Sequence, residues 1–545
     1  MKKMVDFDHF GIMLPVAGRA SMSVQSMKEF FRIISRMGYR EVFLYTEDKM
    51  EVDGEPYHGY MRGRYSKAEL RELDGFAASL GIELIPCVQT LAHLSGLSLW
   101  QTGAVGKDGY NMDAEDVLLV DDERTYTYID NLFAACRECF RTDKIHIGMD
   151  EAHHLGLGRH LDAHGYETKI SIMKRHLARV NAIAAKYGYE NPMIWSDMLF
   201  YGWNNGVYVV PEQPVPEEYK NALPENVIPV FWDYYHDQEK DFGDMLRMHQ
   251  QISSRTWFAG GIWNWTGFIP NNYYTVKSML PALDACRNNG IRDVFMTFWC
   301  GGECSYFANL PSLFYLAEYA RGNADEASIK AKFERMFGIG YDDFCRLDAV
   351  NFITDNWKTV THPRNGADYM LYADPFRGFL DYTVRPGGGE TFTAVGAQLA
   401  ATAKKSRKYG YLFEMGAALC GVMELKYELG LKTRAAYQAN DRTELARLAA
   451  EDYAQLPARI RAFRKAFEKQ WMKENKPGGF EYWTVILGGL EERARHQRRR
   501  LLDYLAGKTD AIEELSWELL PYREKEQSWY YRSYLQSISL QAKHI

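Results

Sequence analysis

The chain has 545 residues, of which 46% are hydrophobic and 25% are charged. This composition is typical of a globular protein, excludes intrinsic disorder as the main state and, at this length, predicts two or three domains. The net charge of -7 and the pI of about 6.1 provide no global positive field, so we expect neither nucleic acid nor a membrane as a partner.

The N-terminal residues contain no apolar run of the kind that a secretion signal needs, and no stretch approaches the roughly 18 apolar residues of a membrane span. Cysteines are sparse, with Cys87 within an expected buried strand and Cys300 at the end of another, as is typical of reduced thiols. We therefore expect a cytoplasmic protein. Cys136 and Cys139 form a lone CxxC, which we interpret as two neighbours on a helix and not as a zinc or redox motif.

The first 325 residues alternate short apolar runs of strand character with amphipathic stretches at helical spacing. The predicted strands are residues 10–17, 41–46, 82–89, 144–149, 192–197, 228–233, 257–263 and 293–299. Ser23 opens a helix that Gly38 ends, and Ser66 with Glu69 forms a capping box. This alternation predicts an α/β fold, a (β/α)8 TIM barrel over residues 1–325. A doubly wound open sheet is the alternative, although no phosphate-binding glycine motif follows any strand.

After residue 325 the alternation stops, and apolar residues recur every three or four positions, as they do from Tyr453 to Trp471. This predicts an all-α C-terminal domain over residues 326–545. We interpret the aromatic segment 480–483 as core packing, with an interface or a cover for the barrel mouth as alternatives. The arginines between residues 493 and 500 are interpreted as a solvated or salt-bridged helix face.

The C-terminal ends of barrel strands form one mouth, and the chemistry of such folds takes place there. The predicted strand ends are rich in carboxylates and aromatic residues, namely Arg19, Glu47, Asp48, His93, Asp150, Glu151, Trp195, Asp197, Trp232, Asp233, Tyr235, Asp237, Trp263, Trp265, Trp299 and Glu303. Indole faces stack on the C–H faces of sugar rings, while carboxylates accept hydrogen bonds from sugar hydroxyls. Although aromatic residues also fill cores, this set indicates a carbohydrate site.

Asp150 and Glu151 are the sharpest feature, because adjacent carboxylates after a buried strand are costly unless they serve a function. Neighbours on a regular strand point to opposite faces, so both reach one cavity only where the strand ends, and Gly148 favours such a break. Adjacent side chains poorly meet the separation of about 5 to 5.5 Å between the acid and the nucleophile of a retaining glycosidase. The pair therefore favours catalysis in which one residue protonates the leaving oxygen and the other orients a 2-acetamido nucleophile of the substrate.

A metal site is the rival interpretation, because His146, Asp150, Glu151, His153 and His154 lie close together in the sequence. The HExxH spacing of a helical zinc site is absent. We therefore expect no metal and no cofactor, with His146 as a structural histidine in the strand and the other two histidines in the following loop.

The segment His146-Ile-Gly-Met-Asp150-Glu151 resembles the His-x-Gly-Gly-Asp-Glu signature of glycoside hydrolase family 20, the β-N-acetylhexosaminidases, with Met149 in place of the second glycine. Met13 to Arg19 resembles the strand-one segment whose arginine holds sugar hydroxyls, although Pro15 stands where the family usually has Asp.

Further matches follow in the family's order. His93 follows Ile85-Pro86 with a longer spacing than in the family, and Trp195 resembles the strand-five indole. Tyr235-His-Asp237 resembles the family's Tyr-x-Asp, and Trp299-Cys-Gly-Gly-Glu303 resembles its final Trp-x-Glu, lengthened by two residues. The resemblance spans the barrel and is closest to compact members that lack the N-terminal α/β domain and carry a helical C-terminal domain.

The resemblance implies an exo-acting, retaining β-N-acetylhexosaminidase that acts on an oligosaccharide or glycoconjugate with a terminal N-acetylhexosamine. Glu151 would be the general acid and then the general base, Asp150 would orient the acetamido group, and Tyr235 would donate to its oxygen. The implied substrate-binding residues are Trp195, Trp232, Trp265 and Trp299 around the acetamido methyl, with Arg19, Asp237 and Glu303 at the outer hydroxyls and His93 as a further contact.

Two other functions stay open at this point. One is a glycosidase of another sugar, in which Glu151 acts with a distant carboxylate such as Glu303 or Asp237. The other is a sugar-binding protein without catalysis. A homodimer is compatible with the sequence in each case.

Overall fold

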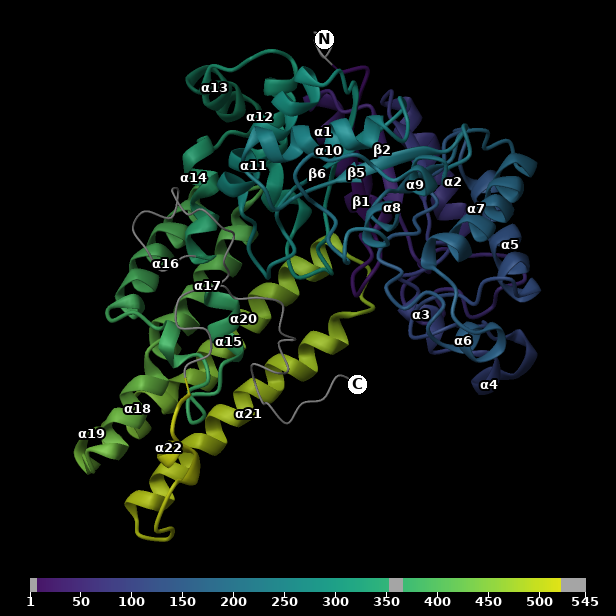
Figure 1. Cartoon of the computed structure of the whole chain (residues 1–545). Coiled ribbons are helices and arrows are strands. Elements are labelled where there is room, and N and C mark those ends of the chain that lie inside the picture. Colours follow the sequence, from purple (N-terminus) through teal and green to yellow (C-terminus); the bar gives the residue numbers. More distant parts are fainter. Residues whose placement is uncertain (1–6, 352–365, 521–545) are drawn as a thin grey trace. The chain divides into compact units, whose positions relative to one another are not determined.

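A computed structural model of the chain describes residues 7–351 and 366–520 (Figure 1). The chain forms two compact units, which we call the barrel unit and the helical unit. The barrel unit comprises Met1–Ile262, Thr275–Gly302 and Ser312–Ile329, and the helical unit comprises Trp263–Tyr274, Glu303–Pro311 and Lys330–Ile545. Two short segments that follow barrel strands therefore belong to the helical unit.

The barrel unit is built on one parallel sheet formed by the apolar runs of the sequence. Its strands are β1 (His9–Pro15), β2 (Glu41–Tyr45), β3 (Glu83–Cys87), β4 (Met193–Trp195), β5 (Ile228–Trp232), β6 (Trp257–Gly261) and β7 (Asp293–Thr297). They lie in the order β3-β2-β1-β7-β6-β5-β4, and each pairing between neighbours is parallel. Parallel neighbours need crossover connections, which the intervening helices supply.

The predicted strand at residues 144–149 is not a regular strand in the structure. His146 instead forms isolated parallel bridges to Cys87 of β3 and to Met193 of β4. The backbone turns left-handed at Gly148 and Met149, with φ of 73° and 72°, and this ends the extended conformation early. Because the bridged segment joins the two edge strands, it takes the place of an eighth strand and closes the ring, so the predicted TIM barrel is confirmed.

The helices that follow the strands begin at the predicted caps. The Ser23 hydroxyl accepts the Ser26 N–H at 3.2 Å, while Ser66 and Glu69 cap each other at 3.1 and 2.8 Å. The helices between β1 and β6 are α1 (Val24–Met37), α2 (Lys67–Ser79), α3 (Ser95–Ser98), α4 (Thr102–Val105), α5 (Glu123–Cys139), α6 (Arg159–His164), α7 (Lys169–Lys186), α8 (Met198–Tyr201), α9 (Glu217–Lys220) and α10 (Glu239–Gln250). Both cysteines of the CxxC are buried free thiols on α5, which confirms that they are helix neighbours.

Inside the ring, inward-facing side chains of the strands form a continuous apolar core, with Met13, Phe43, Ile85, Val230 and Phe295 among its members. These residues are almost completely buried. The barrel is therefore filled by side chains and is not a pore, so any ligand must bind at its mouth.

The helical unit contains the longest helices of the chain. Most of α11 (Asn272–Asn288) and of α12 (Leu310–Ala320) belongs to the barrel unit, and α13 (Glu326–Phe337) begins in the barrel unit and continues in the helical unit. The helical unit then contains α14 (Tyr341–Cys345), α15 (Gly366–Tyr372), α16 (Gly388–Lys405), α17 (Gly410–Lys426), α18 (Leu429–Gln438), α19 (Arg442–Ala450), α20 (Asp452–Glu474), α21 (Phe480–Leu505) and α22 (Glu513–Ser516). The periodic residues from Tyr453 to Trp471 are buried along α20, as their spacing predicts. Phe480 and Trp483 are buried at the start of α21, so this segment packs in a core.

None of the helices in the described part of the chain has the length and apolar character of a membrane span.

The arginine cluster of α21 is a salt-bridged helix face, as predicted. Its side chains bond to Asp374, Glu491, Glu492, Glu514 and the Ala449 carbonyl oxygen. Four of the five arginines are thus paired with carboxylates, and Arg498 bonds to a carbonyl oxygen.

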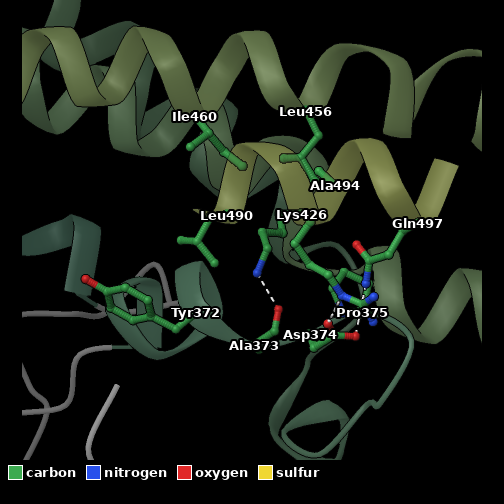
Figure 2. A pocket seen from close by; sticks show the side chains of 11 residues that line it. Tyr372, Ala373, Asp374, Pro375, Lys426, Leu456, Ile460, Leu490, Ala494 and Gln497 are labelled. Carbon is green, nitrogen blue, oxygen red and sulfur yellow. Dashed lines mark hydrogen bonds and ion pairs between the residues drawn. The ribbon is translucent and has the colours of Figure 1, made fainter. Parts of the chain in front are cut away.

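A small pocket lies within the helical unit, lined by α15, α17, α20, α21 and the turn after α15 (Figure 2). Asp374 accepts hydrogen bonds there from Arg493 Nε at 2.6 Å and from Gln497 Nε2 at 3.0 Å. The Lys426 ammonium donates to the Ala373 carbonyl oxygen, and burial lowers the pKa of Lys426 to about 7. These polar groups bind to one another, so the pocket wall is already satisfied within the protein.

Candidate active site

The acidic pair lies where the bridged segment leaves the barrel wall, on a backbone of unusual conformation. Gly148, Met149 and Glu151 have φ of 73°, 72° and 48°, all in the left-handed region. A Cβ on Gly148 would lie 2.0 Å from the Gln89 side-chain oxygen, so only glycine fits there. This turn breaks the alternation of a strand, as predicted, and the carboxylates of Asp150 and Glu151 both reach one imidazole.

That imidazole belongs to His93 and lies between the two carboxylates. Its Nε2 atom is 3.2 Å from Asp150 Oδ2 and 3.4 Å from Glu151 Oε2. Burial alone would lower the pKa of His93, but the charges and hydrogen bonds of the two carboxylates outweigh burial and raise it to about 12. His93 is therefore positively charged at neutral pH and compensates for the acidic pair.

Asp150 is held through both of its oxygens. Gln89 Nε2 donates to Oδ1 at 2.7 Å, while His93 binds Oδ2. The Gln89 oxygen also accepts the Met149 N–H at 3.1 Å, so one amide fixes both the carboxylate and the turn before it. Burial disfavours a charge on Asp150, but His93 outweighs this effect and lowers the pKa of Asp150. An ionised, immobilised carboxylate of this kind is suited to orienting a group and to stabilising a positive charge.

Glu151 is anchored through its backbone by Asp197, which follows β4. Asp197 Oδ2 accepts the Glu151 N–H at 2.8 Å, and Oδ1 accepts Trp232 Nε1 at 3.4 Å. Burial, and then the charge of Asp150, raise the pKa of Asp197 to about 8. Asp197 is therefore mostly protonated at neutral pH and adds little negative charge to the site.

A further carboxyl, the half-buried Glu47, follows β2. The Tyr45 hydroxyl donates to it at 3.2 Å, and its backbone is left-handed, with φ of 44°. Burial and the charge of Asp48 raise the pKa of Glu47 to about 7, although the charge of His93 opposes them. Glu47 thus lies within electrostatic range of His93 and titrates near neutral pH.

Three of the four predicted indole walls lie together in the barrel unit. Trp195 is 1% exposed and belongs to the barrel core, and Trp232 and Trp299 pack against that core while remaining partly accessible. The ring centroids of Trp195 and Trp299 are 6.1 Å apart. The Trp195 indole N–H has no hydrogen-bond partner among the described residues. Trp265 belongs to the helical unit, where it stacks on Trp263 with centroids 4.2 Å apart.

Two tyrosines follow β5, and they differ in environment. Tyr235 is 45% exposed, whereas Tyr234 is 5% exposed. The Tyr234 ring stacks on Trp232 at 5.3 Å and lies 6.4 Å from Trp299. Burial raises the pKa of Tyr234, and the charges of Asp150 and Glu151 raise it further. Tyr234, and not only the predicted Tyr235, is therefore within electrostatic range of the acidic pair.

The three predicted ligands of the outer hydroxyls have different surroundings. Arg19 has an exposed side chain, and its backbone N–H donates to the Gly301 oxygen at 3.2 Å, which joins the loops after β1 and β7. Asp237 Oδ2 binds Lys277 Nζ at 2.9 Å. Glu303 is 7% exposed and belongs to the helical unit. Sugar binding by these residues stays a prediction.

The histidines of the signature segment follow the sequence interpretation. His146 is completely buried against Trp195, and burial lowers the pKa of His146 to about 3, so it is a neutral structural residue. His153 and His154 are exposed in the loop after the acidic pair. None of these three rings contributes to the network around Asp150.

His93, Asp150 and Glu151 have the donor set of a metal site in the described part of the chain. Their ligand atoms lie within 4.8 Å of one another. In this structure these atoms bind to each other, and the protonated imidazole supplies the positive charge that a cation would supply. The interactions of the three residues are therefore satisfied by a proton on His93.

Gln89 and Tyr234 are not among the site residues predicted from the sequence. Glu47 and Asp197 were predicted at strand ends, but without a role in the site. Each of these four residues lies two positions after the last residue of a strand. Gln89 follows β3, Tyr234 follows β5, Glu47 follows β2 and Asp197 follows β4. Side chains alternate along a strand, so a residue two positions beyond an inward-facing strand end continues on the inner face. That spacing is the signal that identifies them.

The comparisons with known proteins agree with this geometry. Residues 37–246 match the family model described as the catalytic domain of glycosyl hydrolase family 20, and residues 342–532 match the glycoside hydrolase 20C C-terminal domain. The chain is a glycoside hydrolase with a barrel and a helical region. It belongs to glycoside hydrolase family 20.

Individual relatives share a minority of residues with the chain. Hexosaminidase D of Homo sapiens is 25% identical over 394 residues, which are 65% of this chain and 75% of that protein. Hexosaminidase D of Bos taurus is 24% identical over 243 residues, which are 42% of this chain and 64% of that protein.

Solved structures that match include the family 20 exo β-N-acetylglucosaminidase of Vibrio harveyi, at 14% identity and a TM-score of 0.44, with 61% of this chain and 58% of that chain covered. The family 20 β-N-acetylhexosaminidase of Streptomyces coelicolor matches at 18% identity and a TM-score of 0.45, with 61% and 70% covered.

Proposed function

We propose that this protein is an exo-acting, retaining β-N-acetylhexosaminidase that releases terminal β-linked N-acetylglucosamine or N-acetylgalactosamine by substrate-assisted catalysis. The observation that carries the proposal is the arrangement of Asp150 and Glu151, adjacent in the chain and bound to the same imidazole. Membership of family 20 supports the class of reaction.

The spacing of the carboxylates argues against an inverting mechanism. One oxygen of Asp150 lies within 4.8 Å of one oxygen of Glu151, whereas the two carboxyl groups of an inverting enzyme are roughly 6.5 to 9.5 Å apart to leave room for a water molecule, so this pair does not fit that mechanism. Asp150 is also a poor nucleophile, because Gln89 and His93 occupy both of its oxygens. These contacts suit Asp150 to accept the acetamido N–H and to stabilise the oxazolinium ion that forms.

Glu151 supplies the proton transfers in this proposal. Its proton passes to the glycosidic oxygen as the bond from that oxygen to C1 breaks and the acetamido oxygen bonds to C1. Water then attacks C1, gives its proton to Glu151 and reopens the oxazolinium ring, so the β configuration is retained. The hydrogen bond from the Glu151 N–H to Asp197 holds the acid in position during both steps.

The remaining residues would bind the sugar. Trp195, Trp232, Trp265 and Trp299 enclose the acetamido methyl, and Arg19, Asp237 and Glu303 bind the outer hydroxyls of the terminal sugar. A tyrosine after β5 donates to the acetamido oxygen. Tyr235 is the residue that the family pattern favours, whereas burial next to Trp232 and the charges of the acidic pair favour Tyr234.

The test is the turnover of 4-nitrophenyl N-acetyl-β-glucosaminide and of the galactosaminide beside the corresponding plain β-glucoside. We expect cleavage of the acetamido substrates alone, and losses of at least about 100-fold in Asp150→Asn and Glu151→Gln. The exposed Glu115→Gln serves as a matched control and should retain full activity. Equal cleavage of the glucoside would indicate a protein nucleophile, and sugar binding without any turnover would indicate a binding protein.

A further inference from the structure

A buried carboxylate in the helical unit holds the segment that carries Glu303. Glu474 is 3% exposed, and its Oε1 atom accepts the Ser305 hydroxyl at 2.6 Å and the Tyr411 hydroxyl at 2.5 Å. Ser305 is two residues after Glu303 and is itself 3% exposed. Glu474 thereby joins the segment after β7 to α17 and α20 within the same compact unit.

Helix stability does not explain this carboxylate. Glu474 is the last residue of α20, where the helix dipole disfavours a negative charge, and burial adds a further penalty. The two short hydrogen bonds from hydroxyl groups compensate for these penalties. Ser305 is oriented for its bond, because its hydroxyl oxygen also accepts the Phe307 N–H at 3.1 Å.

The segment after β6, which carries Trp265, is held by the helical unit as well. Phe268 is 1% exposed and packs against Phe463, Phe467 and Trp483, with ring centroids 5.0, 5.0 and 5.4 Å away. Both segments that carry predicted sugar-binding residues of the helical unit are therefore fixed by buried contacts.

A second buried carboxylate, Asp348, joins the two segments to each other and to the helices. It accepts the Asn272 amide at 3.0 Å and the Tyr273 N–H at 2.9 Å. The same Asn272 amide donates to the Ala308 carbonyl oxygen at 3.1 Å. The segments after β6 and β7 are thus parts of one rigid arrangement that the helices supply.

We infer that Glu474 is a positioning residue for the sugar site, which acts through Ser305 to hold Glu303 in the place where it binds the outer hydroxyls of the substrate. The inference rests on the proposed function. Since displacement of a binding group by about 1 Å costs up to about 100-fold, loss of this contact should weaken binding strongly. Glu303 binds the substrate in the ground state and in the transition state alike, so KM should rise more than kcat falls.

The first test compares Glu474→Leu with Glu474→Gln. Leucine has a similar size but accepts no hydrogen bond, whereas the glutamine oxygen can still accept both hydroxyls. We expect kcat/KM for 4-nitrophenyl N-acetyl-β-glucosaminide to fall roughly 10- to 100-fold in the leucine variant, mainly through KM, and less than about threefold in the glutamine variant. Ser305→Ala removes the same contact with a smaller change in the core and should raise KM in the same direction.

Asp374→Leu is the matched control for the loss of a buried carboxylate. Asp374 lies in the same unit and is 7% exposed, but its partners are Arg493 and Gln497 of α21. This variant should lower the thermal midpoint as the Glu474 variant does and leave KM unchanged. A KM that rises equally in both variants would overturn the inference, because general loosening of the helical unit would then explain the effect.

A double-mutant cycle with Glu303→Ala tests directly whether Glu474 acts through Glu303. If Glu474 acts through Glu303, Glu474→Leu causes little further loss in the Glu303→Ala background, and the losses are not additive. Additive losses would overturn the inference alone and leave the proposed function intact. An unmodified protein without any turnover would overturn the proposed function and this inference with it.

Discussion

The charge on His93 allows a strong prediction about the acidic pair. His93→Gln removes the positive charge that Asp150 and Glu151 share and keeps a side chain that can donate a hydrogen bond. His93 Nε2 lies 3.2 Å from Asp150 Oδ2, and at an effective dielectric constant of about 20 two opposite unit charges at that distance attract by roughly 5 kcal/mol, an interaction that the variant removes. Because the His93 side chain is 32% exposed, solvent screens part of this attraction, and we expect its loss to destabilise the ionised Asp150 by roughly 1.5 to 3 kcal/mol.

The loss of an attraction of this size raises the pH at which Asp150 loses its proton by about one to two pH units. The proposed mechanism needs an ionised Asp150, so the acid limb of the kcat/KM profile should move to higher pH by that amount. The assay is kcat/KM for 4-nitrophenyl N-acetyl-β-glucosaminide between about pH 3.5 and 8. The control is His153→Gln, because the His153 ring is exposed in the loop that follows Glu151. An active His93→Gln enzyme with an unmoved acid limb would refute the argument.

Three further predictions concern residues around the pair. Gly148→Ala should destabilise the fold by about 3 kcal/mol or more in urea unfolding, because the new Cβ would lie 2.0 Å from the Gln89 side-chain oxygen. An unchanged urea midpoint would contradict the expected steric clash. Tyr234→Phe should lower kcat/KM more than about tenfold and Tyr235→Phe less than about threefold, and the reverse order would return the donor role to Tyr235. Folding raises the pKa of Asp197 from 3.8 to about 8. Between these two pH values the folded state binds one proton more than the unfolded state, so the free energy of unfolding falls as the pH rises. Asp197→Asn should flatten this dependence by up to about 1.4 kcal/mol per pH unit, and an equally steep unfolding curve would be inconsistent with a protonated Asp197.

Most of the fold could be predicted from the sequence, because periodicity and caps are local signals. Ser66 with Glu69 and the apolar spacing along α20 give the helices that the structure contains. The conformation of segment 144–149 could not be predicted in full. Its apolar pattern is that of a strand, but its last two residues are left-handed and lie against the Gln89 side chain, which is distant in the sequence. The division into units also depends on distant contacts, such as those of Phe268, that no local pattern reveals.

The candidate site could be predicted where its residues are charged and adjacent, as Asp150 and Glu151 are. The roles of the supporting groups could not be predicted, because Gln89 is uncharged and Asp197 acts on a backbone N–H from a different strand end, although their positions after the strands are visible in the sequence. His93 was predicted as a substrate contact, and the structure adds that it bonds to both carboxylates. Only the closed barrel brings these strand ends together, so their mutual contacts are a property of the tertiary structure.

The central claim is that the substrate, and not a protein carboxylate, supplies the nucleophile. The most direct test is kcat/KM for a series of 4-nitrophenyl β-glucosaminides whose N-acyl group is acetyl, fluoroacetyl, difluoroacetyl or trifluoroacetyl. Each fluorine makes the acyl oxygen less nucleophilic, so substrate assistance predicts a steep, progressive fall in rate along the series. A protein nucleophile leaves the acyl oxygen out of the reaction, and equal rates across the series would contradict the account.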